Sequence, residues 1–494
     1  MSPKIKNRHP EWAVKHKKPG TELRLIKSRY YLYEYKTVYD SVLKKPKKIT
    51  GKSLGSITEK DGLKPSRSIL EKRIQNSSRI NIKSSSILVK EFGMSQLVLN
   101  KFTETQSQLK KQFGEKWVEV FAMAFVRLVY KCPLKAVSYH LERSLISEKL
   151  SIKPFNEKTA SGVLNTIGGM QESMQNYMKS FIKKGDYILM DGTSILSKSK
   201  EISFAKPGYN SKRDFGGQIN LMYIYSASQK MPVFYRLLSG NIKDVKAFKN
   251  TLALSGITNA TIIADKGFYS KQNIEVLIKE KFKFIIPMKR DNIYIDYSSL
   301  KDNRFKSNDN YFNFEERVIW YKSYDLGDTI LHQFLDDRLR TIEEKDYLDR
   351  ITENSTKNTI EKYHERQSKF GTISMLTPKK MKDSIEVYES YKGRGAIETM
   401  FDGMKNILEA DNTYMQNEQT LEGWMFVNHI CLQWYQSIYI ELKEKNILKK
   451  YSVSDYIRHL AGIYKVKIDN EWILSENTKS TLKLMESIGL AYNT

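Results

Sequence analysis

Cysteine is scarce in this sequence: Cys132 and Cys431 are the only two among 494 residues, and they lie far apart. Because no CxxC pair is present, the sequence supports neither a disulfide framework nor a thiolate metal site, and a reducing, intracellular compartment is expected. Histidine is also rare. The seven histidines form no H-x-x-x-H or similar ligand pair, which disfavours a zinc enzyme.

Long apolar runs are missing as well. The longest uncharged stretch, residues 423–440, is interrupted by Asn428, His429, Gln433 and Gln436, so it predicts a buried helix rather than a membrane span. The N-terminal residues lack the apolar core of a signal peptide. We therefore expect a protein without membrane association.

Acidic residues are few compared with basic ones. The chain has 82 Lys and Arg against 56 Asp and Glu, which gives a net charge of +26. Residues 1–90 alone hold 23 Lys and Arg against 7 Asp and Glu, so most of the excess lies there. This charge exceeds what solubility requires, and it favours a polyanionic partner.

The hydrophobic pattern predicts an α/β protein built from several segments. Strands are expected over 22–57 with a basic turn at KKPKK, helices over 95–183, and a mixed sheet covered by helices after Gly185. The predicted segments are a basic, strand-rich region at 1–90, a helical region at 91–183, the first part of the sheet core at 184–289, a β-rich insertion at 290–385, the last core helix at 386–420 and a C-terminal helical region at 421–494.

Two aspartates follow apolar strands. Asp191 comes after DYILM in the motif MDGTS, and Asp265 comes after TIIA in ADKGFYS. A carboxylate at this position faces a desolvation cost, and the carboxyl end of a strand commonly opens onto a ligand-binding crevice. Taken alone, each motif is more typical of a turn.

A third acidic residue lies in the segment YKGRGAIETMFDGMK. On one continuous helix starting near Ser390, Tyr391, Arg394, Glu398 and Lys405 fall within an arc of about 60°, beside an apolar face that would pack on the sheet. The alternative is a solvated, charged edge with an i,i+4 pair between Arg394 and Glu398.

Taken together, two aspartates and a helix-borne glutamate are the ligand set that Mg²⁺ prefers. Carboxylate oxygens from Asp191, Asp265 and Glu398 can hold one or two such ions, with Mn²⁺ as the expected substitute. A pair of metal ions activates a water or a 3′-hydroxyl and stabilises the leaving oxygen at phosphorus. Tyr391, Arg394 and Lys405 would then contact phosphate oxygens.

These residues resemble the DDE-type insertion-sequence transposases of the cut-and-paste group, which carry a Y-x2-R-x3-E-x6-K signature. Tyr391, Arg394, Glu398 and Lys405 match its spacing at every position. DGT at 191–193 and D-x-G-F-Y at 265–269 resemble the two aspartate motifs, and GNIKD at 240–244 and PMKR at 287–290 resemble neighbouring stretches. We expect Asp244 to cap a helix rather than bind metal.

The resemblance implies a ribonuclease H-like mixed-sheet catalytic core with a β-rich insertion, a basic N-terminal domain and helical flanking regions. Asp191 would lie on the first core strand, Asp265 at the end of the fourth, and Glu398 on the helix after the insertion. The implied reaction cuts double-stranded DNA at the terminal inverted repeats with two Mg²⁺ ions and transfers the 3′ ends into target DNA. A homodimer in the DNA complex and a cytoplasmic, nucleoid-associated location in a bacterial or archaeal cell are also implied.

Members of this group can release the element through a hairpin, which requires a flipped base stacked on an aromatic ring. Trp320 is our candidate for that platform, and a tryptophan in the insertion's own small core is the alternative. For end recognition, the N-terminal region and the helices after it are candidates. The lysines of KKPKK would follow a phosphate backbone or form a solvated loop; they are Lys44, Lys45, Lys47 and Lys48.

Two other functions remain open from the sequence. A nuclease of the same fold would hydrolyse DNA without strand transfer, and an inactive relative would only bind DNA through its basic surface. Three clustered carboxylates without metal would repel one another and DNA, which argues against the inactive relative. The C-terminal helical region is the candidate for dimerisation.

Overall fold

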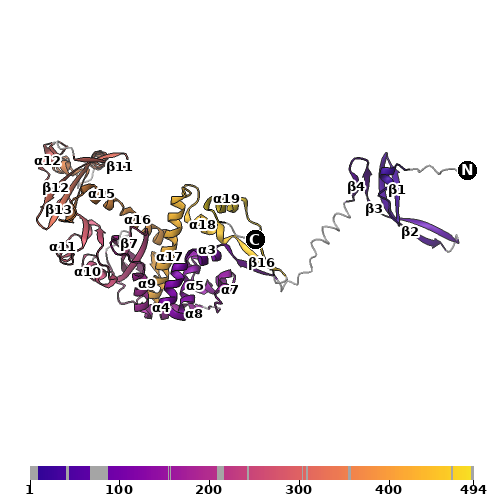
Figure 1. Cartoon of the computed structure of the whole chain (residues 1–494), viewed down its shortest axis with the longest axis horizontal. Helices are drawn as coiled ribbons and strands as arrows, with labels where there is room; N and C mark the ends of the chain where they lie inside the picture. Colours follow the sequence, from indigo (N-terminus) through magenta and orange to yellow (C-terminus); the bar gives the residue numbers. More distant parts are fainter. Residues whose placement is uncertain are drawn as a thin grey trace. The chain divides into compact units, whose positions relative to one another are not determined.

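The computed structural model of the chain divides into two compact units, which we describe separately (Figure 1). The first unit comprises Met1–Leu88 with Lys467–Glu471, and the second comprises Val89–Val466 with Trp472–Thr494. The structure describes residues 9–40, 44–66, 87–153, 155, 157–208, 216–241, 244–302, 304–306, 310–353, 358–468 and 471–490, with no side chains at 244–246.

The N-terminal unit is an antiparallel sheet with the strand order β1-β2-β3-β4. Its small core consists of Ala13, Leu32 and Ile57, and the ring of Trp12 packs edge-on against Tyr30. The strands predicted over 22–57 are confirmed. Its elements are α1 (Glu11–Val14), β1 (Thr21–Ile26), β2 (Arg29–Asp40), β3 (Lys45–Thr58) and β4 (Gly62–Pro65).

The predicted turn at KKPKK is wrong for most of its length. Only Lys44 lies in a turn, with a left-handed φ of 45°, whereas β3 begins at Lys45 and pairs with β2 through Asp40↔Lys45 and Thr37↔Lys48. Proline and lysine are poor strand formers, but an edge of a two-stranded ribbon tolerates both because their backbone groups can face solvent.

In the second unit, the helices predicted over 95–183 are confirmed. They pack around the long helix α17 (Glu418–Glu444), whose Trp434 stacks on Phe102 with ring centroids 4.9 Å apart. The predicted burial of residues 423–440 is also confirmed, and three of the four polar side chains named above, those of Asn428, Gln433 and Gln436, make buried hydrogen bonds, such as that of Gln433 to Pro232 O. The helices are α3 (Gly93–Lys101), α4 (Thr103–Phe113), α5 (Trp117–Tyr130), α6 (Val137–Glu142), α7 (Leu145–Lys149), α8 (Glu157–Gly169) and α9 (Gln171–Lys179).

The centre of this unit is a mixed sheet with the order β11-β12-β13-β14-β10-β9-β6-β7-β8. Strands β6, β7 and β8 are antiparallel neighbours, whereas β9 is parallel to β6 and β10 is parallel to β9. The predicted mixed sheet is therefore present. Its first strands are β6 (Tyr187–Ser197), β7 (Gly217–Ser226), β8 (Met231–Ser239), β9 (Thr261–Ala264) and β10 (Lys283–Pro287), with helices α10 (Asp244–Ser255) and α11 (Lys271–Lys279) and the short strand β15 (Asn412–Thr413) beside β6.

Strands from residues 290–385 extend the same sheet. Strand β14 joins β10 antiparallel through Ile286↔Leu376 and Pro287↔Met375, and β13, β12 and β11 follow outward from it. The β-rich segment therefore shares backbone hydrogen bonds with the core strands. Its elements are α12 (Ser298–Lys301), β11 (Tyr311–Phe314), β12 (Arg317–Asp325), β13 (Thr329–Asp336), α13 (Asp337–Thr352), α14 (Ile360–Arg366) and β14 (Thr372–Pro378).

The single helix expected near Ser390 is instead two helices and a π turn. Helix α15 (Ser384–Lys392) ends before Gly393, helix α16 (Gly395–Asp402) follows, and a π turn covers Gly403–Ile407. At the break, Arg394 N bonds to Tyr391 O and Ile397 N bonds to Arg394 O, which are tighter i→i−3 bonds. Two glycines around Arg394 weaken the continuous helix, because glycine loses the most backbone entropy there.

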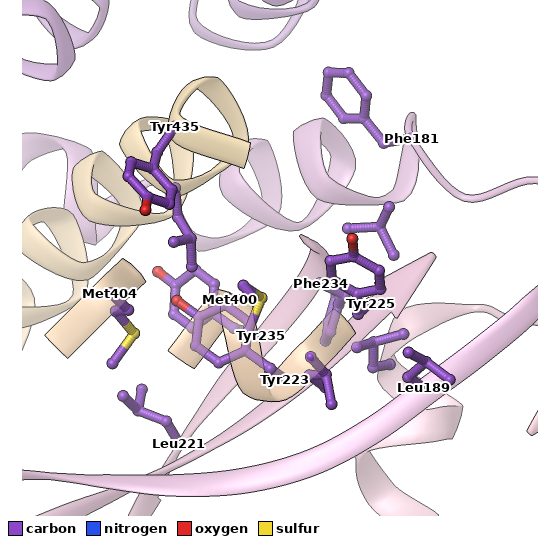
Figure 2. Close-up of a cluster of buried hydrophobic side chains, with 14 of the residues drawn as sticks. Phe181, Leu189, Leu221, Tyr223, Tyr225, Phe234, Tyr235, Met400, Met404 and Tyr435 are labelled. Carbon is purple, nitrogen blue, oxygen red and sulfur yellow. The ribbon is translucent and has the colours of Figure 1, made fainter. Parts of the chain in front are cut away.

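The apolar face predicted for this segment is confirmed. Met400 and Met404 are fully buried and lie between the sheet residues Tyr223 and Leu221 and the Tyr435 ring of α17 (Figure 2). This packing fixes α16 over strands β6 and β7. Beyond α17, the predicted C-terminal helices continue with α18 (Val453–Ala461) and α19 (Lys479–Ile488), beside a small sheet in the order β17-β16-β5 formed by β17 (Glu471–Leu474), β16 (Tyr464–Ile468) and β5 (Leu88–Glu91).

No helix within the described ranges has the length and apolar character that a membrane crossing needs.

Candidate active site

Two adjacent strands place the aspartates side by side. Strand β9 pairs in parallel with β6 up to Met190↔Ala264, so the next residue of each strand is Asp191 and Asp265. Contrary to the sequence interpretation, β6 does not end at Asp191. It continues to Ser197 because β7 still pairs with it, whereas β9, whose four residues are all buried, stops at Ala264. Asp191 therefore lies where β6 loses its parallel neighbour.

Arg394 joins the three acidic residues. Its Nη2 donates to Asp191 Oδ2 at 2.6 Å, and its Nη1 donates to Glu398 Oε1 at 2.9 Å and lies 3.8 Å from Asp265 Oδ1. The break between α15 and α16 positions this arginine at the start of α16, one turn before Glu398. The structure therefore brings together three carboxylates that lie far apart in the sequence, around one guanidinium.

Exposure differs among these side chains. Asp191 and Arg394 are nearly enclosed, at 16% and 15% side-chain exposure, while Glu398 is 62% exposed. The i,i+4 pair of Arg394 and Glu398 that the alternative interpretation expected is present, but it belongs to this larger cluster rather than to a solvated edge. The buried Nε of Arg394 has no hydrogen-bond partner among the described residues.

The charges of the cluster are strongly coupled. Burial raises the pKa of Asp191, and the Arg394 guanidinium and the Gly192 N–H oppose that rise. Although burial acts against it, the negative charge of Asp191 and Asp265 raises the pKa of Arg394 above its usual value. Arg394 thus supplies the positive charge that offsets the burial of Asp191, and it lies within 4 Å of Asp265 and Glu398 as well.

A cleft of about 540 Å³ opens beside Asp265 and Tyr391. Strand ends of β13 and β14 form its other wall, and burial raises the pKa of the Tyr391 hydroxyl. Basic residues that the sequence argument did not assign line it: Lys266, Lys289, Arg290 and Lys392. The sequence contained signals for these basic residues, since Lys266 directly follows Asp265, and Lys289 and Arg290 belong to the PMKR motif at the end of β10. Arg290 is committed to Thr372 O and Glu343, so it fixes the wall of the cleft.

Lys405 and Trp320 are the remaining sequence-predicted site residues of the second unit. Lys405 is half-buried in the π turn that directly follows α16. Trp320 pairs with Leu335 across β12 and β13, whereas the cleft residues Phe334 and Asp336 face the opposite side of the sheet. The Trp320 ring is half-buried against Tyr311, with centroids 5.2 Å apart.

The KKPKK lysines lie in the N-terminal unit. Lys44, Lys45, Lys47 and Lys48 are all exposed. Lys48 is engaged within that unit, because its Nζ lies 2.6 Å from Glu22 Oε2 and 3.9 Å from the centre of the Tyr35 ring.

Residues 183–434, just over half of the chain, match the family model described as the transposase DDE domain. The chain therefore belongs to the DDE-type transposases.

Two solved transposase structures are similar to parts of the chain. The piggyBac transposase synaptic complex with hairpin DNA has a TM-score of 0.38 and 11% identity over 70% of each chain. The Mos1 transposase paired-end complex with the left transposon end has a TM-score of 0.15 and 11% identity, over 31% of this chain and 54% of that one. No curated protein sequence matches the chain.

Transposases of this family generally use divalent metal ions, so the residues can be tested for their fit to one. The donor set suits a hard cation, because all three side chains are carboxylates and all lie within 4 Å of one positive group. In the described part of the chain, no three His, Cys, Asp or Glu side chains are already close enough together to hold an ion. The three carboxylates therefore have the donor type that a hard cation prefers, but Arg394 lies between them. A cation would bind there only if the arginine moved.

Proposed function

We propose that the chain is the transposase of an insertion sequence, which binds the DNA ends of the element, cleaves them and transfers the 3′ ends into target DNA. The observation that carries this proposal is the convergence of Asp191, Asp265 and Glu398 on Arg394. Two Mg²⁺ ions, or Mn²⁺ in their place, would supply activation of water or a 3′-hydroxyl and stabilisation of the leaving oxygen.

The residues of the chain perform the binding and positioning. Asp191 on β6 and Asp265 directly after β9 would hold the ions, and Glu398 would complete the donor set from α16. Arg394 has two alternative anionic partners, the carboxylates and a DNA phosphate, and its planar fork suits both. Tyr391 and Lys405 are proposed to contact phosphate oxygens as well, and Lys266 and Lys289 give the cleft a positive wall.

The same proposal includes a ribonuclease H-like core. Its support is the spatial strand order β8-β7-β6-β9-β10. In chain order, β6 is the first strand of the core and carries Asp191, and β9 is the fourth and leads into Asp265. We also propose that the DNA-bound form is a homodimer and that the segment boundaries given above delimit functional regions. Trp320 stays a proposal for stacking a flipped base in a hairpin, although it lies on the sheet face opposite the cleft.

The experiment uses the full chain, Mg²⁺, a supercoiled plasmid and a linear duplex that carries the DNA flanking this reading frame. We expect cut ends first and then products in which those ends are joined to the plasmid. Cut ends that are never joined would favour the nuclease function. Binding without any cleavage would favour the inactive DNA-binding relative, and either result would overturn the proposal.

A further inference from the structure

The N-terminal unit contains a two-stranded ribbon that extends past the rest of its sheet. Strand β1 pairs with β2 only up to Glu34, and β4 pairs with β3 only from Gly55 onward. From Lys36↔Ile49 to Asp40↔Lys45, the two strands pair only with each other within the described residues (Figure 1). We call the described residues 36–40 and 45–49 the β2–β3 ribbon.

Apolar side chains on this ribbon are unusually exposed. Val38 is 49% exposed, Ile49 is 50% exposed and Tyr39 is 66% exposed. A two-stranded ribbon has no third strand or helix against which to bury these three side chains, and an isolated hairpin is only marginally stable in water. A ribbon of this composition is suited to bury them against a partner.

The register separates the ribbon into two faces, because directly paired residues lie on the same side of an antiparallel ladder. Lys36, Val38, Lys45, Lys47 and Ile49 share one face, together with Asp40. On the other face, Lys48 is already held by Glu22, whose pKa falls to about 2 chiefly because Lys48 hydrogen-bonds to it. In the described part of the chain, Lys36, Lys45 and Lys47 make no ion pair, so the first face combines two aliphatic side chains with three uncommitted cations.

We propose that this first face of the β2–β3 ribbon inserts into the major groove of double-stranded DNA. The inference rests on the proposed function, in which DNA is the substrate. The major groove admits a two-stranded β-ribbon, and phosphates border both of its edges. Lys36, Lys45 and Lys47 reach those phosphates, while Val38 and Ile49 contact base edges such as thymine methyl groups.

The base of the ribbon is built to hold its direction. Glu22 on β1 accepts from Arg24 and Thr50 as well as pairing with Lys48, so side chains of β1 and β3 are tied together across β2 where the ribbon leaves the sheet. A fixed base lowers the entropy lost when the ribbon enters a groove. The charge favours DNA over an apolar protein partner, because a protein groove that buried Val38 and Ile49 would also have to desolvate three lysines.

The test measures binding of the full chain to a fluorescein-labelled, 30-base-pair duplex of mixed sequence across a range of salt concentrations. The triple variant Lys36→Gln, Lys45→Gln and Lys47→Gln is compared with a control that loses the same charge elsewhere in the unit, at Lys17, Lys60 and Lys64, all of which are exposed. Circular dichroism checks that both variants keep the parent's fold.

We expect the ribbon variant to bind about tenfold more weakly at physiological salt, with a log–log salt slope about 2 to 3 smaller in magnitude. The control should stay within about twofold of the parent. The double variant Val38→Ala and Ile49→Ala should weaken binding with an unchanged slope, because it removes no phosphate contact. Methylation of guanine N7 in the duplex should interfere with binding, whereas distamycin, which occupies the minor groove, should not.

Equal losses in the ribbon and control variants would overturn the proposal, because they would show a response to net charge alone. Competition by distamycin without N7 interference would place the ribbon in the minor groove and would also overturn it. Parental binding by both ribbon variants would point to a protein partner for the apolar face. The end-joining assay on the same preparations separates the two proposals. If the ribbon variants bind DNA like the parent and still give joined products, only the proposal for the ribbon is rejected. If the ribbon binds the major groove but the protein does not cleave the ends, only the proposed catalytic function is rejected.

Discussion

Arg394 is the residue on which the electrostatics of the candidate site depend. It is the cation that the structure places among Asp191, Asp265 and Glu398, and it contacts all three. Without it, the mutual repulsion of the carboxylates and the burial of Asp191 act in the same direction, against the charged forms. The same side chain therefore stabilises the carboxylate cluster and would compete with a cation bound by these carboxylates.

Replacing Arg394 should make the folded protein depend on added cations. For Arg394→Gln in chelator-containing buffer, we expect a loss of about 1–3 kcal/mol in the free energy of unfolding, because the largely enclosed Asp191 carboxylate loses its charged hydrogen-bond partner. Millimolar Mg²⁺ should then raise the melting temperature of this variant more than it raises that of the parent. Differential scanning fluorimetry with and without Mg²⁺ measures both effects.

Lys266→Gln is the matched control, because Lys266 is an exposed cation next to Asp265 that contacts the cleft rather than joining the carboxylates. Its melting temperature and its response to Mg²⁺ should be close to those of the parent. If Arg394→Gln and Lys266→Gln respond equally to Mg²⁺, Arg394 does not compete for the carboxylates.

His429 is a buried histidine that lowers the stability of the folded protein at acidic pH. Both ring nitrogens are buried without hydrogen-bond partners among the described residues, and the ring packs between Tyr223 and Tyr235. Burial lowers the pKa of His429 to about 3, from 6.5. Because the unfolded chain binds this proton near pH 6.5 and the folded chain does not, His429 lowers stability progressively as the pH falls below 6.5.

The variant His429→Leu should remove this pH dependence. We expect the parent to lose about 1.4 kcal/mol more stability per pH unit than the variant between pH 6 and pH 4. Buried Glu91 and half-buried Glu422, whose pKa values desolvation raises to about 7, give a slope of opposite sign that is common to both proteins. Melting temperatures compared across this pH range test the prediction, and parallel curves for the two proteins would contradict it.

At the scale of elements, the crossing of α8 and α17 depends on two glycines. A Cβ atom on Gly168 would lie 1.7 Å from Gln419 O, and one on Gly423 would lie 2.0 Å from Leu164 O. Both obstacles are backbone atoms, which cannot move away as a flexible side chain can. The close approach allows α17, which carries Trp434 and Tyr435, to pack against the helical region and α16 at once.

Gly168→Ala should therefore separate the two helices and lower stability by about 1–3 kcal/mol, through overpacking. Gly162→Ala in the same helix is the control, because a Cβ there meets nothing within 4 Å. The control should be neutral or more stable by up to about 1 kcal/mol, since alanine is the better helix former. Thermal unfolding of the two variants tests this contrast, and an equal effect of both substitutions would contradict the close-approach argument.

The elements differ in how far the sequence could predict them. Helix α17 and the buried strands β6 and β9 have strong local patterns, so their types were predictable. The extension of β6 past Asp191 was not, because it depends on which neighbour, β7 or β9, continues alongside it. The helix break at Gly393 was predictable in part from the low helix propensity of glycine. Its result was not, because tertiary packing places Arg394 among the three carboxylates.

The candidate site was predictable to a similar extent. The acidic residues and Arg394 are identified by motif spacing, and the structure brings those four together. The cleft beside them was not predictable, since its walls come from β13, β14 and α15, which meet only in the folded sheet. The position of Trp320 on the opposite face likewise depends on strand register, and a shift by one residue would reverse it.

At the scale of the whole molecule, the two compact units carry different features. The N-terminal unit holds much of the positive charge and the exposed β2–β3 ribbon, whereas the second unit holds the sheet and the carboxylate cluster. We therefore expect DNA binding by the N-terminal unit to be separable from DNA cleavage by the second. Salt should weaken binding steeply, because the lysines release counterions from DNA.

The measurement that tests the central claim most directly is Mg²⁺-dependent cleavage of DNA flanking the reading frame by Asp191→Asn, Asp265→Asn and Glu398→Gln. Binding of the same DNA is measured in parallel, and Glu389→Gln, at an exposed glutamate on α15, is the control. We predict that each of the three variants loses cleavage by at least about 10³-fold, as removal of an essential catalytic group does, while binding changes by less than about threefold. Glu389→Gln should cleave like the parent. Retained cleavage in any one of the three variants would contradict the role of that carboxylate, and retained cleavage in all three would contradict the account.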